Sequence, residues 1–114
     1  MTRYFGFALA DSMFSKATVI RRSILTVEQV KAKLEEGYVS CCNPSHVSTI
    51  QAAEKRFGLI VDIPATPPRV DVGPGDSVIV MGVRGLPRLT DRHEYSEEEV
   101  AQATFQFSEY IVTE

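Results

Sequence analysis

Apolar residues gather in five short stretches of the chain, and their composition predicts β-strands. Each stretch is rich in β-branched and aromatic residues and is bounded by turn-forming residues. These stretches cover residues 3–9, 17–25, 37–42, 77–83 and 109–112. The segment SVIVMGV at 77–83 is an almost continuous apolar run, which is typical of a central strand covered on both faces.

Helix starts are marked twice by the spacing of polar residues. Thr26 and Gln29 can form a capping box at the start of one helix, and Ser96 and Glu99 repeat this spacing near the C-terminus. Each helix then continues with apolar residues at helical spacing. The sequence therefore predicts helices that begin after Thr26 and Ser96, the second one running on to Phe107.

A third helix is predicted between them, with Ser45 or Ser48 as its cap and Gly58 as its end. Gly37 can end the first helix in the same way. The three predicted buried stripes are Val27, Val30 and Leu34; Ile50, Ala53 and Phe57; and Val100, Ala103 and Phe107.

Strands mixed with helices in this order predict one α/β domain over residues 1–114, with a mixed sheet of about five strands flanked by helices. The 114 residues, 44% of them apolar and 24% charged, fit one domain of ordinary composition. A chain of this length can bury roughly two-thirds of its unfolded surface, so the fold needs neither a metal nor a disulfide.

The setting that the composition favours is a reducing cytoplasm. Cys41 and Cys42 are neighbours that point to opposite faces of an extended chain, so a disulfide between them would be strained. The apolar part of the N-terminus is short and is broken by Asp11, and no run approaches the roughly 18 apolar residues of a membrane helix. A net charge of -3 gives no reason to expect binding to long nucleic acid.

Three common kinds of chemistry find little support. Cys41, Cys42 and His46 have suitable donor atoms for zinc, but structural zinc sites space their cysteines two to four residues apart. Ser45 and His46 are adjacent, so their side chains diverge and do not form a nucleophile with its base. The glycines of VGPGD and VMGVRG lack the spacing of nucleotide-binding loops. We therefore expect no metal and no cofactor.

His46 stands where a helix is predicted to start. The first amides of a helix lack carbonyl partners and carry a partial positive charge, which together attract phosphate. Ser48 and Thr49 would add hydroxyl groups, and the imidazole of His46 could transfer a proton to a phosphate ester. The alternative interpretation is a capped helix start with a surface histidine. His93 is expected to be an exposed loop residue.

Residues 45–49, Ser-His-Val-Ser-Thr, are similar to a Gly-His-x-Ser-Thr stretch that opens a helix in a small α/β family. The family occurs in archaeal viruses, phages and some bacterial genomes, and its viral members are anti-CRISPR ring nucleases of type III systems. The resemblance continues in the Thr-Val-Glu-Gln-Val-Lys helix, the Ser-Val-Ile-Val strand and the Ser-Glu-Glu-Glu helix with an aromatic-rich strand after it. It spans nearly the whole chain.

The resemblance implies a homodimer that holds cyclic tetra-adenylate across its two-fold interface and cleaves it without a metal, in the host cytoplasm if the protein is viral. A ribose 2′-hydroxyl would attack phosphorus, His46 would act as general acid, and Arg84 would stabilise the phosphate. The implied ligand-binding residues are Ser12, Ser45, Ser48, Thr49 and Arg88. Ala10 stands where the family has a ligand-contacting serine. The second hypothesis is therefore a module that binds a cyclic nucleotide or a protein partner without chemistry.

Overall fold

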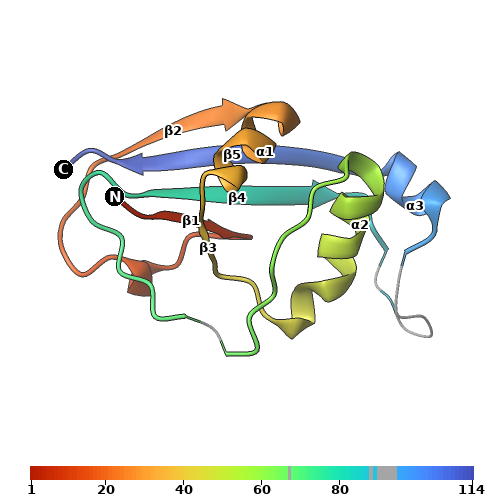
Figure 1. Cartoon of the computed structure of the whole chain (residues 1–114), viewed down its shortest axis with the longest axis horizontal. Helices are drawn as coiled ribbons and strands as arrows, with labels where there is room; N and C mark the ends of the chain where they lie inside the picture. The colour runs from red at the N-terminus through yellow and green to blue at the C-terminus, as the bar shows by residue number, and fades with distance from the viewer. Residues whose placement is uncertain (67, 88, 90–94) are drawn as a thin grey trace.

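Five strands form one mixed sheet in the order β2-β5-β4-β1-β3 (Figure 1). The computed structural model describes residues 1–66, 68–87, 89 and 95–114. β1 pairs in parallel with β3 and β4, whereas β5 runs antiparallel to both β4 and β2. The predicted α/β fold with a five-stranded mixed sheet is confirmed. The strands are β1 Arg3–Gly6, β2 Ile20–Leu25, β3 Val39–Ser40, β4 Ser77–Arg84 and β5 Thr104–Val112.

Helices α1 and α2 lie on one face of this sheet (Figure 1). The helices of the described residues are α1 Val27–Glu35, α2 Val47–Phe57 and α3 Glu97–Gln102, and the short 3₁₀ turns are η1 Asp11–Met13 and η2 Pro44–His46. None of these helices combines the length and the apolar composition that crossing a lipid bilayer requires.

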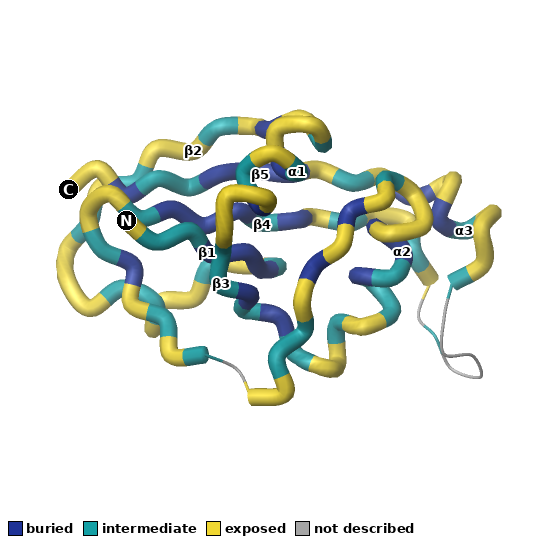
Figure 2. The backbone as a smooth tube through the Cα atoms, viewed as in Figure 1, coloured by how far each residue is buried: buried dark blue, intermediate teal, exposed yellow. Residues whose placement is uncertain are grey.

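The sheet carries a core on each face, and the central strand β4 contributes to both. Ile79 and Met81 pack with α1 and α2 in the helix-side core, while Val78 and Val80 pack on the other face. On that other face the cover comes from η1 and from loop residues, among them Met13 and Val72 respectively. Figure 2 shows the buried positions concentrated along the central strands. The prediction that 77–83 is central and covered on both faces is confirmed for its first five residues.

Both predicted capping boxes are present. The Thr26 hydroxyl accepts from the Gln29 amide at 3.2 Å while the Gln29 side chain accepts from the Thr26 amide at 2.8 Å. Ser96 and Glu99 make the same pair of bonds at 3.2 and 2.9 Å. α2 ends at Gly58 in the left-handed conformation, with φ of 71°. These local signals placed the starts of α1 and α3 and the end of α2.

The predicted extension of the last helix to Phe107 is wrong. α3 ends at Gln102, and Ala103 already has an extended backbone with ψ of 150°. Residues from Thr104 onward form β5, which pairs with β4 on one side and β2 on the other. Phe107 is buried all the same, because its side chain joins the helix-side core from the strand. The strand predicted at 109–112 therefore begins five residues earlier than expected.

The first three strands are shorter than the predicted ranges: β1 ends three residues earlier, β2 begins three residues later, and β3 is shorter at both ends. Both cysteines are free, as expected. Cys42 packs in the helix-side core and Cys41 on the opposite face. Their opposite directions agree with the alternation of an extended chain.

Candidate functional site

The segments that carry the candidate residues leave the same edge of the sheet. Because β1, β3 and β4 are parallel, their carboxyl ends meet at one edge. Ser12 follows β1, His46 follows β3, and Arg84 is the last residue of β4. In open α/β sheets, ligands bind outside the carboxyl ends of the strands. The topology thus places the segments after β1 and β3, and the end of β4, at the edge where this class of fold builds its sites.

The segment Asn43–His46 forms a closed turn ahead of α2. The Asn43 side-chain oxygen accepts from the amide of Ser45 at 2.9 Å and also from the Ser45 hydroxyl. The amide of His46 donates to the carbonyl of Asn43 at 2.9 Å. The prediction that Ser45 or Ser48 caps α2 is wrong, because Asn43 caps the preceding turn and His46 occupies the α2 cap position without a side-chain bond.

The His46 ring is held by one hydrogen bond and one ring contact. Its Nδ1 accepts from the amide of Asn43 at 3.2 Å, and its centroid lies 4.4 Å from that of Phe7 at an angle of 38°. Partial burial lowers the pKa of His46 below its ordinary value. Since Nδ1 accepts a bond, the neutral ring carries its proton on Nε2. In this tautomer Nε2–H can donate a hydrogen bond.

Ser48 and Thr49 lie in the first turn of α2 and are half-buried. This turn is the positive end of an 11-residue helix whose last turn carries Lys55 and Arg56. The sequence-predicted residues from Ser45 to Thr49 are therefore together at one helix start, with the side chain of Ser45 bound to Asn43.

Ser12 lies beside an arginine that sequence reasoning missed. It lines a depression of about 350 Å³ with Met13, Cys41, Pro68, Arg69 and Val70. The amide of Cys41 donates to the Phe5 carbonyl at 2.7 Å, so this depression lies next to the β1–β3 edge. Arg69 is exposed and supplies a guanidinium suited to phosphate. No local motif marks it, because the fold brings it to Ser12 from a distant segment.

The side chain of Arg84 leaves β4 on the sheet face opposite helices α1 and α2. Val83 packs with Phe7 against the helix-side core, and alternation along β4 turns the next side chain to the other face. Arg84 lines a separate cavity of about 220 Å³ with Gly82, Val83, Thr104 and Gln106. His46 does not line this cavity. Arg88 and His93 lie outside the described residues.

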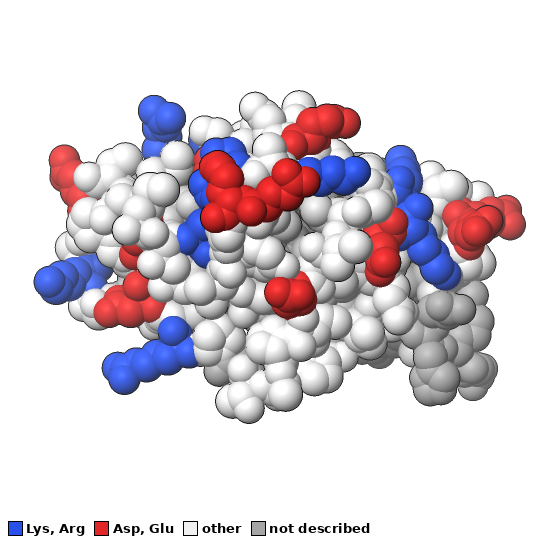
Figure 3. Space-filling model, in the orientation of Figure 1, with Lys and Arg blue, Asp and Glu red and all other residues white. Residues whose placement is uncertain are grey.

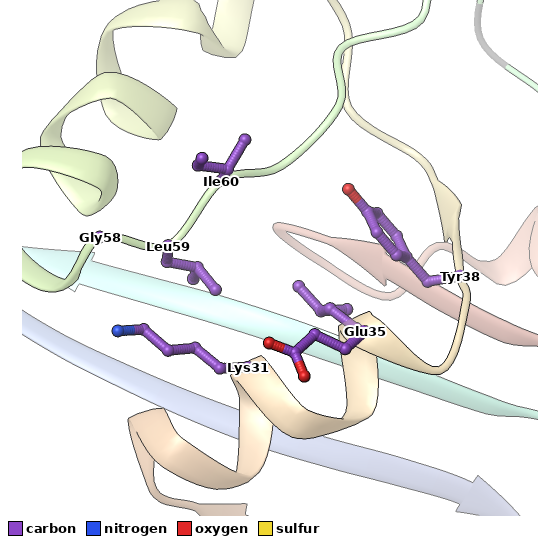
Figure 4. Close-up of a pocket in the computed structure, with 7 residues that line it drawn as sticks. Lys31, Glu35, Tyr38, Gly58, Leu59 and Ile60 are labelled. Carbon is purple, nitrogen blue, oxygen red and sulfur yellow. The ribbon is translucent and has the colours of Figure 1, made fainter.

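A further pocket lies between α1 and the segment after α2 (Figure 4). It measures about 290 Å³ and is lined by Leu34, Leu59, Tyr38 and the charged Lys31 and Glu35, among others. None of the sequence-predicted site residues that the structure describes lines it. Figure 3 shows both signs of charge interspersed over the face that bears α1 and α2. Within the described part of the chain, no three side chains of His, Cys, Asp or Glu are grouped to hold a metal ion.

The architecture is shared with a viral protein. That protein is B116 of Sulfolobus turreted icosahedral virus (STIV), which matches with a TM-score of 0.70 over 97% of this chain and 99% of its own. The two sequences are 19% identical, so the likeness establishes the fold alone. No protein-family model and no curated sequence matches the chain.

Proposed function

We propose that the chain is a metal-independent phosphodiesterase that binds and cleaves cyclic tetra-adenylate at the interface of a homodimer. The observation that carries the proposal is the environment of His46. A half-buried imidazole stands at the start of α2, with Nδ1 engaged by Asn43 and the proton on Nε2. In this state the Nε2–H group can donate a hydrogen bond to a phosphate oxygen. Acid catalysis requires the imidazolium, in which Nδ1 is protonated as well and no longer accepts from Asn43.

The reaction is an internal transesterification. The 2′-oxygen of a ribose forms a bond to the adjacent phosphorus, the bond from phosphorus to the 5′-oxygen breaks, and a 2′,3′-cyclic phosphate end results. The proton of the 2′-hydroxyl is released to solvent, while His46 gives a proton to the departing 5′-oxygen. A bound phosphate favours the charged imidazolium, which is the stronger acid. General acid catalysis of this kind contributes about 10²–10⁴ in rate.

The positive end of α2, with Thr49, supports binding of a phosphate close to His46. Arg84 and Arg69 are exposed guanidinium groups; Arg84 ends β4, and Arg69 lies on the segment between α2 and the amino end of β4. Arg84 begins on the other sheet face, so a second copy related by a two-fold axis is the proposed route by which both groups reach one ring. A symmetric dimer also presents two copies of each group to a symmetric ligand.

Incubation with cyclic tetra-adenylate in EDTA tests the proposal. The wild type should produce linear fragments ending in cyclic phosphate, identified by mass spectrometry, and His46→Ala should lower the rate at least about a hundredfold. Gln102→Leu, an exposed change at the end of α3, should leave the rate unchanged. Absence of cleavage by the wild type, or equal cleavage by His46→Ala, would remove the proposal. Sedimentation with and without the ring tests the dimer.

A binding module without chemistry is the second candidate. The observation that favours it is Ser45, whose hydroxyl donates to Asn43 and is therefore not directed to a ligand. Ala10 also offers no hydroxyl next to η1. Calorimetry with cyclic tetra-adenylate separates the two functions, because tight binding with no turnover supports the module alone.

A further inference from the structure

The base of the cavity beside Arg84 is strand backbone that no side chain covers. Gly82 of β4 stands directly opposite Gln106 of β5, and Arg84 stands opposite Thr104 in the same register. All four residues are exposed on the sheet face that lacks helices. Because Gly82 has no side chain, the Gln106 amide borders an open stretch of backbone rather than a cross-strand partner.

The polar groups around this floor are specific in kind. Gln106 presents a carboxamide with both donors and acceptors, Thr104 a hydroxyl, and Arg84 a guanidinium. Among the residues that the structure describes, no carboxylate lines the cavity. Gln is the side chain that pairs in bidentate fashion with the N6 and N7 edge of adenine, and a flat unsubstituted floor accommodates an aromatic ring.

The cavity has the size for one base. Its volume is about 220 Å³. Pockets for drug-sized ligands measure about 300–1,000 Å³, so a whole cyclic oligonucleotide does not fit. A single base fits, with its sugar outside the cavity. The guanidinium at one end then lies where the phosphate of the same nucleotide would follow.

We propose that this cavity is an adenine subsite, in which Gln106 reads the edge of the base, the backbone at Gly82 forms the floor and Arg84 holds the attached phosphate. This subsite rests on the proposed cleavage of cyclic tetra-adenylate. It adds to that proposal by assigning the base specificity to this face of the sheet. Such a bidentate pair discriminates between bases by roughly tenfold or more.

Two variants test the subsite without disturbing the fold. Gly82→Val fills the floor. A Cβ there meets only the Gln106 carbonyl oxygen at 3.8 Å, an ordinary contact, and valine suits a strand. Gln106→Leu removes the carboxamide. Gln102→Leu is the matched control, because it makes the same change at an exposed position outside the cavity. Thermal unfolding of each variant verifies that the fold is intact.

Affinity for cyclic tetra-adenylate and for cyclic tetra-uridylate is measured by calorimetry, and AMP and UMP are titrated into ¹⁵N-labelled protein. We expect both cavity variants to lose at least about tenfold in affinity for the adenine ring, with Gln102→Leu unchanged. AMP, and not UMP, should shift the amides of Gly82 and Gln106.

The outcomes separate the subsite from the cleavage reaction. If the wild type cleaves cyclic tetra-adenylate and both cavity variants bind it as tightly as the wild type, the subsite is wrong and the function stands. A second outcome is that the wild type fails to bind cyclic tetra-adenylate while AMP, and not UMP, shifts the amide signals of Gly82 and Gln106. That result supports the adenine subsite and overturns the proposed ring nuclease activity. Equal response to AMP and UMP overturns the subsite.

Discussion

The amide of Asn43 donates a hydrogen bond to Nδ1 of His46, at 3.2 Å. The same asparagine accepts two bonds from Ser45, so one residue fixes both the turn and the tautomer of the ring. Phe7 covers the ring from the β1 side, at a centroid distance of 4.4 Å. A residue of the wrong size or polarity at position 43 would therefore alter the proton chemistry of His46 as well as the stability of the turn.

The pKa of His46 should be lower in the folded protein than its ordinary value of about 6.5, because partial burial disfavours the imidazolium. An NMR titration of the two histidine ring signals measures it, with His46→Gln identifying the signal. A folded pKa at or above 6.5 in the absence of ligand would contradict the role of burial.

The same shift makes stability depend on pH. Between the lowered folded pKa and the unfolded pKa, the unfolded chain binds more protons, so the free energy of unfolding rises with pH. The contribution of His46 is complete above the unfolded pKa and is lost as pH falls below it. Urea unfolding at pH 7.5 and 5.5 should show a smaller loss for His46→Gln than for the wild type. An equal loss in both proteins would show that other groups cause it.

Arg56 closes the end of α3 from the neighbouring helix. Its Nη1 donates to the carbonyls of Val100, Ala101 and Ala103 at 2.8, 3.0 and 3.0 Å. Arg56→Ala should lower the free energy of unfolding by about 1–2 kcal/mol, since hydrogen bonds from a charged donor are lost. Arg56→Lys should recover part of this. The control is Arg21→Ala, which changes another exposed arginine; a similar loss there would refute the capping role.

Gly58 ends α2 with φ of 71°, where a side chain is strained. Gly58→Ala should cost about 1 kcal/mol of the free energy of unfolding, measured by urea denaturation. Gly73→Ala is the control, because that residue does not have a positive φ and a Cβ there meets Asp76 at 3.8 Å. Equal effects of the two changes would mean that backbone strain at Gly58 is not the cause.

What the sequence revealed was chiefly local. The two capping boxes, Thr26 with Gln29 and Ser96 with Glu99, could be predicted because their bonds join residues only three apart. The apolar positions around Phe107 fit a helix and a strand equally well, and pairing of β5 with two neighbouring strands decides for the strand. That pairing is tertiary, so the pattern of one segment could not show it.

The candidate site likewise has residues that the sequence could single out and residues that it could not. His46 could be singled out because a histidine at a helix start has a local signature. The bond from Asn43 to its ring could not, since Ser45 and Ser48 looked equally suited to cap the helix. Arg69 lies beside Ser12, and Gln106 lies opposite Gly82. Each becomes a candidate site residue only through a neighbour that is distant in the sequence.

An ion pair between a partly exposed lysine and a buried glutamate joins α1 to β5. Lys33 Nζ lies 3.4 Å from Glu109 Oε2, and the side chain of Glu109 is 7% exposed against 32% for Lys33. Lys33→Met should lower the free energy of unfolding by about 3 kcal/mol, because it leaves a buried carboxylate without its cation. Glu109→Leu should cost less, since the Lys33 ammonium can turn to water.

The double variant Lys33→Met with Glu109→Leu should be more stable than Lys33→Met alone, because an apolar pair of similar volume removes the unpaired charge. Urea denaturation of the four proteins gives the coupling energy directly. If the two single losses add up to the loss of the double variant, the pair does not contribute to stability, and the position of Glu109 on the helix-side face must be maintained by packing alone.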